Sequence, residues 1–245
     1  MNKSEIERIL GQVRERREAS DTRSTPSPEE VGRVWPSPKW TAGRYPQRHR
    51  ALLGEKVDKG CEVYTSQGAG EPLLDWPDQY AEKHATAYKA LLEGDCAVLV
   101  IGPRGTGKTQ LAVEYSVMLE RDLCEVGEDW AGRPENKTRL THAYYRLGDL
   151  FEKQKASFDD KSEGPLKRAA NVDLLVLDEL QEVTGSNWEM QQLTRLIDQR
   201  YLTMKRTVMV ANLAFASAKE FLGDSAWSRL SETGVVLEWD GPTMR

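Results

Sequence analysis

The sequence predicts an α/β fold with a parallel β-sheet, because three apolar stretches have the composition of buried strands. These stretches span residues 96–101, 172–180 and 206–213. Strands that are apolar along their whole length are typical of the centre of a parallel sheet, where both faces are covered. Open α/β sheets bind ligands at the carboxyl ends of their strands. We therefore expect a ligand site at that edge of the sheet.

The first stretch runs into a glycine-rich turn and then into a helix-forming segment, "VLVIGPRGTGKTQLAV" (98–113). The turn fits the Walker A pattern G-x-x-x-x-G-K-[ST], with a predicted strand before it and a predicted helix after it. Backbone N–H groups and the positive end of the helix dipole then face nucleotide phosphates. We expect Lys108 to contact the terminal phosphates of ATP and the Thr109 hydroxyl to bind Mg²⁺. The predicted ATP-binding residues are Gly102, Pro103, Arg104, Gly105, Thr106, Gly107, Lys108 and Thr109.

The second stretch, "VDLLVLDEL", ends in two carboxylates. We expect Asp178 to hold Mg²⁺ directly or through water, as a partner of Thr109. Glu179 is the candidate that orients and deprotonates the attacking water. The alternative is that the two acids only cap the next element.

The third stretch, "RTVMVANL", ends in Asn212, whose amide is placed to hold the water between Glu179 and the γ-phosphate. A turn-forming asparagine is the alternative. Further on, Arg229 is predicted to lie on a short helix before the last strand. An arginine that contacts the γ-phosphate bound to a neighbouring subunit would stabilise the transition state. An ordinary surface arginine in a salt bridge is the alternative for Arg229.

The N-terminal region differs in composition from the rest of the chain. Residues 1–50 carry eleven Lys and Arg against seven Asp and Glu, a net charge of +4, whereas the whole chain carries −5. Within 1–18, Ile6, Ile9, Leu10 and Val13 share one face of a predicted amphipathic helix. Residues 19–75 form a predicted proline-rich linker, and 76–245 the predicted ATPase domain, which opens with a helix in 76–94. The basic and aromatic part of the linker, 31–50, suits single-stranded nucleic acid or a tether docked on its own domain.

Composition excludes several classes of protein. The three cysteines are scattered without metal-ligand spacing, so neither a disulfide framework nor a zinc site is expected. The mean hydropathy is −0.62, and no apolar run reaches the roughly 18 residues that a membrane span needs. The N-terminus has no signal-peptide pattern. We therefore expect a cytoplasmic protein without a membrane partner.

The order of these motifs resembles the DnaC/IstB branch of the AAA+ ATPases. The resemblance rests on the Walker A motif, "LLVLDEL", "VANL", "SRL" and the closing "VVLEWDG", and it covers roughly residues 80–245. It implies a three-layer P-loop sandwich with a five-stranded parallel sheet and no C-terminal lid domain, preceded here by an extended N-terminal arm. Family loaders often carry a second arginine where this chain has Ser225. Arg229 is therefore the one candidate here for an arginine finger, an arginine that acts on the nucleotide of a neighbouring subunit.

Two downstream segments add detail to the resemblance. Residues 145–158 are similar to the extra helical segment of initiators and helicase loaders, and "TGSNWEMQQLTRLIDQRY" is similar to the segment after Walker B in bacterial DnaC. The resemblance implies that Phe158, Ser186 and Trp188 line a path for single-stranded DNA. For Phe158, a core aromatic on an amphipathic helix is the alternative.

The resemblance implies ATP-dependent loading of a hexameric replicative helicase onto single-stranded DNA, with hydrolysis as a switch. It also implies an ATP-dependent oligomer, and it makes the amphipathic segment around 6–13 the candidate contact for the helicase. Two alternatives stay open. One is a transposition ATPase of the IstB type, which binds duplex DNA and a transposase. The other is a nucleotide-gated adaptor with vestigial hydrolysis.

Overall fold

The computed structural model describes residues 72, 74, 76–93, 97–123, 125–128, 134–138, 140–157 and 164–240. The chain divides into two compact units, Met1–Lys89 with Val117–Arg139 and Ala90–Ser116 with Leu140–Arg245. The predicted helix at 1–18 and nearly all of the predicted linker lie outside the described residues, and so does Phe158. These assignments stay predictions.

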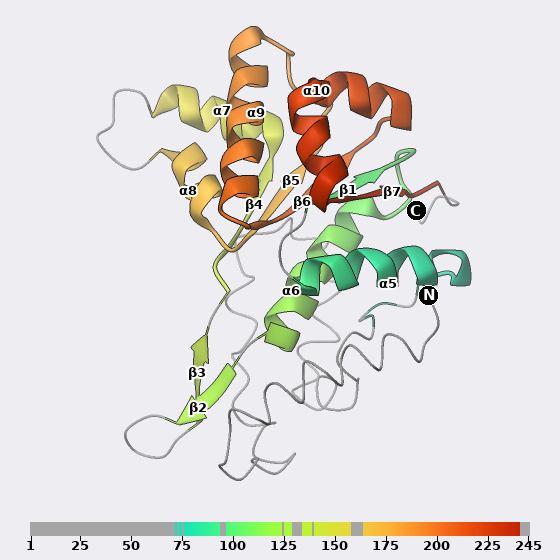
Figure 1. The fold of residues 1–245 in the computed structure, drawn as a ribbon, viewed down its shortest axis with the longest axis vertical. Coiled ribbons are helices and arrows are strands. Elements are labelled where there is room, and N and C mark those ends of the chain that lie inside the picture. The colour runs from blue at the N-terminus through green and yellow to red at the C-terminus, as the bar shows by residue number, and fades with distance from the viewer. Residues whose placement is uncertain are drawn as a thin grey trace. The chain divides into compact units, whose positions relative to one another are not determined.

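The second unit contains a five-stranded sheet in the order β4-β5-β6-β1-β7 (Figure 1). All four pairings are parallel. The three stretches predicted as strands contain β1, β5 and β6, so the α/β fold with a five-stranded parallel sheet is confirmed. The strands are β1 (Ala97–Ile101), β4 (His142–Arg146), β5 (Leu174–Asp178), β6 (Arg206–Ala211) and β7 (Val235–Glu238).

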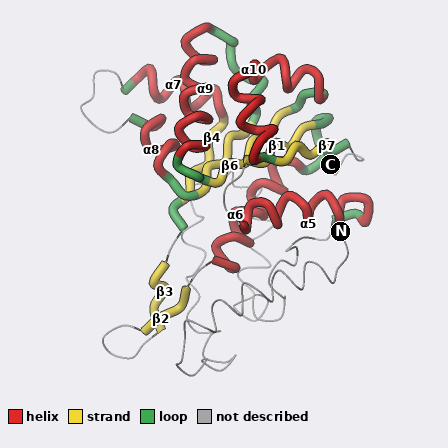
Figure 2. The backbone as a smooth tube through the Cα atoms, viewed as in Figure 1, coloured by secondary structure: helices red, strands yellow, loops and turns green. Residues whose placement is uncertain are grey.

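Four helices of this unit lie on one side of the sheet (Figures 1 and 2). The last of them bends at Gly223, whose φ of 71° interrupts the helix. The part after the bend is the helix predicted before the last strand, and it carries Arg229. The four helices are α7 (Leu147–Ala156), α8 (Pro165–Asn171), α9 (Asn187–Leu202) and α10 (Phe215–Thr233).

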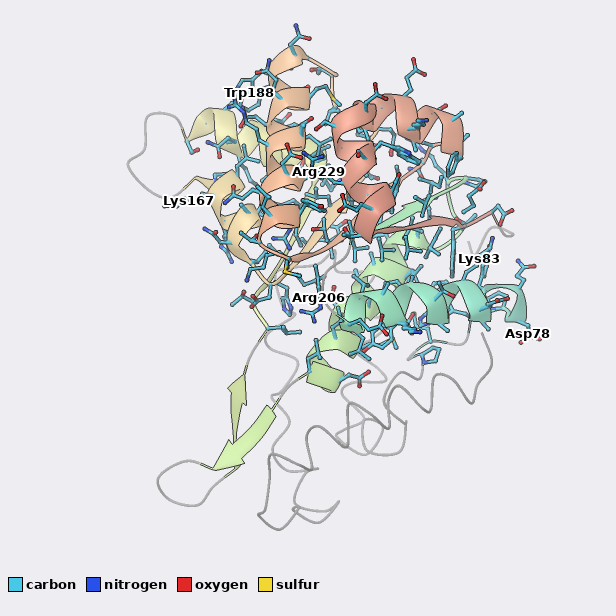
Figure 3. All side chains as sticks on the ribbon, viewed as in Figure 1. Asp78, Lys83, Lys167, Trp188, Arg206 and Arg229 are labelled. Carbon is cyan, nitrogen blue, oxygen red and sulfur yellow. The ribbon has the colours of Figure 1, made fainter. Side chains whose placement is uncertain are left out.

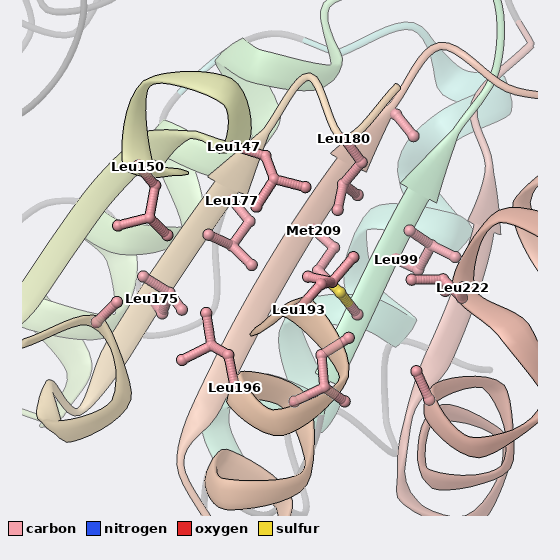
Figure 4. Packing of buried hydrophobic residues seen from close by; sticks show 14 of the residues in the cluster. Leu99, Leu147, Leu150, Leu175, Leu177, Leu180, Leu193, Leu196, Met209 and Leu222 are labelled. Atoms are coloured by element: carbon pink, nitrogen blue, oxygen red, sulfur yellow. The ribbon is translucent and has the colours of Figure 1, made fainter. Parts of the chain in front are cut away.

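The core between these helices and the sheet follows the two-residue period of the strands. Leu99, Leu177 and Met209 point to the helices and pack in one cluster with Leu193 of α9 and Leu222 of α10 (Figure 4). The alternate strand positions are buried as well, which explains why these strands are apolar throughout. The alternate positions are Val98, Val100, Leu174, Val176, Val208 and Val210.

Two helices have residues in both units, namely α5 (Asp78–Glu93) and α6 (Lys108–Leu123). In the first unit, Tyr88 donates a hydrogen bond of 2.5 Å to Asp122. This unit also contains an antiparallel hairpin that the sequence did not predict, β2 (Glu125–Glu128) with β3 (Pro134–Thr138). Among the described residues, no helix combines the length and the apolar composition that crossing a membrane requires.

The end of α5 is tied to the sheet within the second unit. The guanidinium group of Arg206, at the start of β6, donates to the Leu91 carbonyl oxygen over 2.5 Å (Figure 3). The last turn of α5 contains no basic residue. Arg206 therefore supplies a hydrogen-bond donor to one of the carbonyl groups that have no partner within α5.

The register of the sheet brings the predicted site residues to one edge. Ile101 pairs with Ala211 on one side and with Glu238 on the other. Arg146 pairs with Asp178, which ends β5. The residues that follow these strands therefore meet at the carboxyl edge.

Candidate nucleotide site

The P-loop joins β1 to α6 and has a backbone shape that requires glycine. Gly102, Gly105 and Gly107 have φ angles of 142°, 87° and 88°, which side chains adopt only with strain. A Cβ atom on Gly102 would lie 2.3 Å from the backbone oxygen of Trp239, so this position also lacks space for a side chain. The loop leads directly into α6, as an anion site at a helix N-terminus requires.

Lys108 is folded back onto the loop. Its ammonium group donates hydrogen bonds to the carbonyl oxygens of Gly102, at 2.9 Å, and of Pro103. The residue is buried, and burial lowers the pKa of Lys108 to about 8, although the charge of Asp178 opposes this shift. A phosphate in place of these carbonyls would favour the charged form. An anion bound here would therefore stabilise the charged form of Lys108.

Thr109 and Asp178 are in direct contact, as a shared Mg²⁺ site requires. The Thr109 hydroxyl donates to Asp178 Oδ2 over 2.9 Å, and the Tyr144 hydroxyl donates to the same oxygen over 2.5 Å. Burial, together with the charge of Asp178, raises the pKa of Tyr144, so this hydroxyl stays a donor. No group of three His, Cys, Asp or Glu suited to a metal occurs among the described residues. Mg²⁺ bound with nucleotide takes one or two protein oxygens plus phosphates and water, so the pair fits this ion.

Glu179 lies immediately after β5 in a strained conformation. Its φ of 53° is in the left-handed region, where a non-glycine residue is strained, and strained residues of this kind cluster at active sites. Its N–H donates to Asp178 Oδ1 over 2.8 Å. Its carboxylate is held in an ion pair by Arg146, which also contacts Glu182 at 2.6 Å. Burial and the neighbouring Glu182 raise the pKa of Glu179, and Arg146 opposes this shift. A raised pKa suits a general base.

Asn212 follows β6 beside the P-loop, because its neighbour Ala211 pairs with Ile101. Its backbone N–H donates to the Gln181 side chain over 2.8 Å, which ties the loop after β5 to the end of β6. The Asn212 amide makes no hydrogen bond with any described residue. This side chain has the position and the free hydrogen-bonding capacity that the predicted water contact needs.

Arg229 is the predicted site residue that the fold places elsewhere. It lines a small hollow together with Ala97 and Thr207, which lie at the starts of β1 and β6. Figure 3 shows Arg229 on α10 next to α9, where its guanidinium lies 3.2 Å from Asp198 and 5.4 Å from the centre of the Tyr201 ring. The five residues of β1 separate this amino edge from the P-loop, about 13 Å at the rise of a strand. Arg229 therefore lies away from the nucleotide site of its own chain.

Two of the three residues expected along a DNA path are described, and both have structural partners. The Ser186 hydroxyl caps α9 by accepting the Glu189 N–H, in a reciprocal capping box. Trp188 is half-buried, with its ring edge-to-face on Phe151 at 5.7 Å and the Lys155 ammonium 5.2 Å from the ring centre (Figure 3). These contacts explain why both residues are held in place, and their role toward DNA stays a prediction.

Sequence reasoning missed three residues at this edge. Tyr144 and Arg146 lie on β4, a strand with polar residues that the sequence did not predict. Trp239 donates its indole N–H to the Thr106 carbonyl oxygen inside the P-loop. A signal for Trp239 existed in "VVLEWDG", because this tryptophan directly follows a predicted strand and therefore lies at the predicted ligand edge.

A parallel sheet with a glycine-rich loop after β1, and a Thr–Asp pair beside that loop, define the P-loop class of nucleotide-binding proteins. Residues 97–223 match the family model described as AAA domain (dynein-related subfamily). Since this match spans more than half of the chain, the chain belongs to the AAA+ ATPases.

The chain is also similar to particular proteins at distant identity. It is 29% identical to YdaV of Escherichia coli (strain K12), an uncharacterized protein, over 144 residues that cover 57% of this chain and 52% of YdaV. It is 29% identical to the replicative helicase loader DnaC of Buchnera aphidicola subsp. Schizaphis graminum over 101 residues, 38% of this chain and 41% of that DnaC. The match thus spans about half the length of these relatives.

A solved structure of a DnaC helicase loader has a similar fold. Its TM-score is 0.53 at 19% identity, and the match covers 67% of this chain and 93% of that one. This identity supports a shared fold. Within the AAA+ family, the 29% sequence identity to the DnaC of Buchnera aphidicola makes the chain a distant relative of the DnaC helicase loaders.

Proposed function

We propose that this chain binds ATP with Mg²⁺ and hydrolyses it to ADP and phosphate. The position of Asp178 and Glu179 at the end of β5, with Asp178 hydrogen-bonded to Thr109 of the P-loop, carries the proposal. Lys108 binds the terminal phosphates, and Thr109 with Asp178 binds the ion. Glu179 orients and deprotonates the attacking water, which Asn212 holds from β6. Phosphoryl transfer to water requires positioning and charge stabilisation of this kind.

The position of Arg229 supports an assembly in which each nucleotide lies between two copies of the chain. Because Arg229 lies at the amino edge of its own sheet, it reaches a γ-phosphate only in a neighbouring subunit. An arginine supplied in this way stabilises the charge of the transition state. The proposed active form is therefore an oligomer that assembles when ATP is bound.

The proposed biological role is the loading of a hexameric replicative helicase onto single-stranded DNA in the cytoplasm, with ATP hydrolysis as the switch. The similarity to proteins named as replicative helicase loaders supports this role. The predicted amphipathic helix at 1–18 serves as the helicase contact, since an amphipathic helix on a proline-rich tether suits docking into an apolar groove.

For DNA, we propose that Trp188 provides a stacking surface, with Ser186 and Phe158 along the same path. Trp188 is half-buried, its ring is oriented by Phe151, and a cation lies over it. Base–aromatic stacking tolerates any sequence and requires unpaired bases. The ring therefore suits single-stranded DNA better than duplex.

The decisive test is capture of the host's replicative helicase by the full chain, with and without ATP, and transfer of that helicase to single-stranded DNA. We expect capture by the full chain and none by a chain that lacks residues 1–50. The point variant Ile9→Asp should also lose capture, because it puts a charge on the apolar face. Helicase capture by the truncated chain would overturn the proposed role of the arm.

Single-strand affinity tests the DNA contact separately. Trp188→Ala should weaken binding by about 1 to 3 kcal/mol while nucleotide affinity stays unchanged. Trp227→Ala is the matched control, because Trp227 is also half-buried and packs edge-to-face on a phenylalanine, Phe215. Equal losses in the two variants would remove Trp188 from the DNA path. Tighter binding to duplex than to single strands would favour a transposition ATPase of the IstB type.

A nucleotide-gated adaptor is the second candidate, and the ion pair between Arg146 and Glu179 favours it. In that case the wild-type chain binds ATP tightly and shows no turnover, even with DNA and helicase present. Measurable turnover under any of these conditions would exclude the adaptor.

A further inference from the structure

Trp239 lies directly after β7 and contacts the P-loop region at two points. Its backbone N–H donates to the Ile101 carbonyl oxygen over 2.7 Å, which extends the pairing of β1 with β7 by one residue. Its indole N–H donates to the Thr106 carbonyl oxygen over 2.9 Å. The side chain is completely buried. One residue therefore holds both the last residue of β1 and a residue inside the loop.

The hydrogen bond to Thr106 determines the direction of the next backbone donor. The Thr106 carbonyl and the Gly107 N–H belong to one planar trans peptide group, so they point in opposite directions. Because the carbonyl is fixed toward the buried indole, the Gly107 N–H is fixed toward the other side of the loop. No described residue accepts a hydrogen bond from this N–H. The donor is thus oriented and open to an anion.

Several other contacts that hold the loop are made within the loop itself. The Thr106 hydroxyl donates to the Pro103 carbonyl oxygen over 3.1 Å, and Lys108 donates to the carbonyls of Gly102 and Pro103. Lys108 has to leave these carbonyls when it binds a phosphate. The indole of Trp239 has no such competing role, so its bond to Thr106 is compatible with both the empty and the loaded loop.

We propose that Trp239 is a positioning residue of the phosphate cradle: its indole N–H holds the Thr106 carbonyl and thereby directs the Gly107 N–H at a phosphate of the bound nucleotide. This inference rests on the proposed ATP site. It assigns a role to a residue that is 130 positions from Thr109 in sequence and belongs to no nucleotide-binding motif.

The proposal has a spectroscopic consequence. An anion bound to the Gly107 N–H polarises the peptide group and strengthens its carbonyl as an acceptor. The bond from the Trp239 indole to that carbonyl then shortens, and the indole N–H proton signal moves downfield. A tryptophan that only fills space under the loop has no reason to respond in this direction.

The test is a titration of the ¹⁵N-labelled full chain with ADP and Mg²⁺, followed through the indole N–H signals. The Trp239 signal is identified by its absence from Trp239→Phe. We expect this signal to move downfield with nucleotide, while the signal of Trp227 stays in place. In calorimetry, Trp239→Phe should bind ADP about tenfold more weakly, because it keeps an aromatic ring and loses only the donor. Trp227→Phe should stay within about twofold of the wild type.

The outcomes separate this inference from the proposed ATP site. A wild-type chain that binds no ADP would overturn the ATP site itself. A wild-type chain that binds ADP with an unmoved Trp239 signal would overturn the role of Trp239 alone, as would a Trp239→Phe variant that binds ADP like the wild type. If Trp239→Phe does not fold, single Trp→Phe replacements of the other tryptophans identify the Trp239 signal by elimination, and the wild-type titration still decides.

Discussion

The two edges of the central sheet are built in opposite ways. At the carboxyl edge, Lys108 donates to the Gly102 carbonyl oxygen and Thr109 donates to Asp178, each over 2.9 Å. At the amino edge, Leu202 at the end of α9 is 77% exposed and Met204 in the turn that follows is 59% exposed. The Arg229 side chain beside Asp198 is also partly exposed.

This difference indicates a division of tasks. An edge whose polar groups are already gathered by hydrogen bonds suits phosphate chemistry, because the groups that act on the nucleotide lie close together before it binds. Exposed side chains at the amino edge leave that surface accessible to a second copy of the chain. The proposed composite site joins the carboxyl edge of one copy to the amino edge of the next, and the following variants test each edge in turn.

The largest effects are expected at the carboxyl edge. Lys108→Ala should abolish ATP binding. Glu179→Gln should keep binding and lower turnover on the order of 10²- to 10⁴-fold, because an amide cannot accept the proton of water. Calorimetry and phosphate release measure the two steps. Glu220→Gln, on the surface of α10, is the matched control, and undiminished turnover in Glu179→Gln would remove Glu179 from its catalytic role.

The amino edge should give the next largest effect. Arg229→Ala should lower turnover on the order of 10²- to 10³-fold, while ATP affinity stays close to that of the wild type, since the arginine acts on the transition state. Arg195→Ala, an exposed arginine on α9, should leave turnover unchanged. Equal activity in the two variants would contradict a finger role for Arg229.

The pH dependence of nucleotide affinity should report Lys108. Its pKa in the free protein is about 8, and bound phosphates raise it because they favour the charged form. Below pH 8 the lysine is charged in both states, so affinity is constant. Above pH 8 binding has to take up a proton, and ATP affinity should fall by up to about tenfold per pH unit. Affinity that stays constant to pH 10, measured by calorimetry, would contradict this environment.

The smallest effect is expected at Arg146, which restrains Glu179. The guanidinium is about half exposed, so the ion pair is worth about 1 kcal/mol or less. Arg146→Ala should therefore raise basal turnover about two- to fivefold, whereas Arg168→Ala on α8 should not. A large loss of turnover in Arg146→Ala would instead place this arginine on the phosphates.

The parts that the sequence predicted have local signals. The loop 102–109 has its pattern in eight consecutive residues, and β1, β5 and β6 are apolar because both faces of each strand are buried. The hairpin of β2 and β3 and the strand β4 have no such signal, since their residues are largely polar. The partners of Glu179 were missed for this reason, because Arg146 reaches Glu179 only through the pairing of β4 with β5. Contacts set by register across strands cannot be predicted from spacing along the chain.

Mixing subunits tests whether the carboxyl edge of one copy and the amino edge of another form one ATPase site. Lys108→Ala and Arg229→Ala are each expected to be inactive alone, and the two proteins are mixed in equal amounts with ATP while phosphate release is followed. Sites that combine an intact Lys108 from one copy with an intact Arg229 from the other should restore a clear fraction of wild-type turnover. Two well-folded variants whose mixture stays as inactive as either alone would contradict a site shared between copies. A monomer that hydrolyses ATP at a rate independent of protein concentration would contradict it as well.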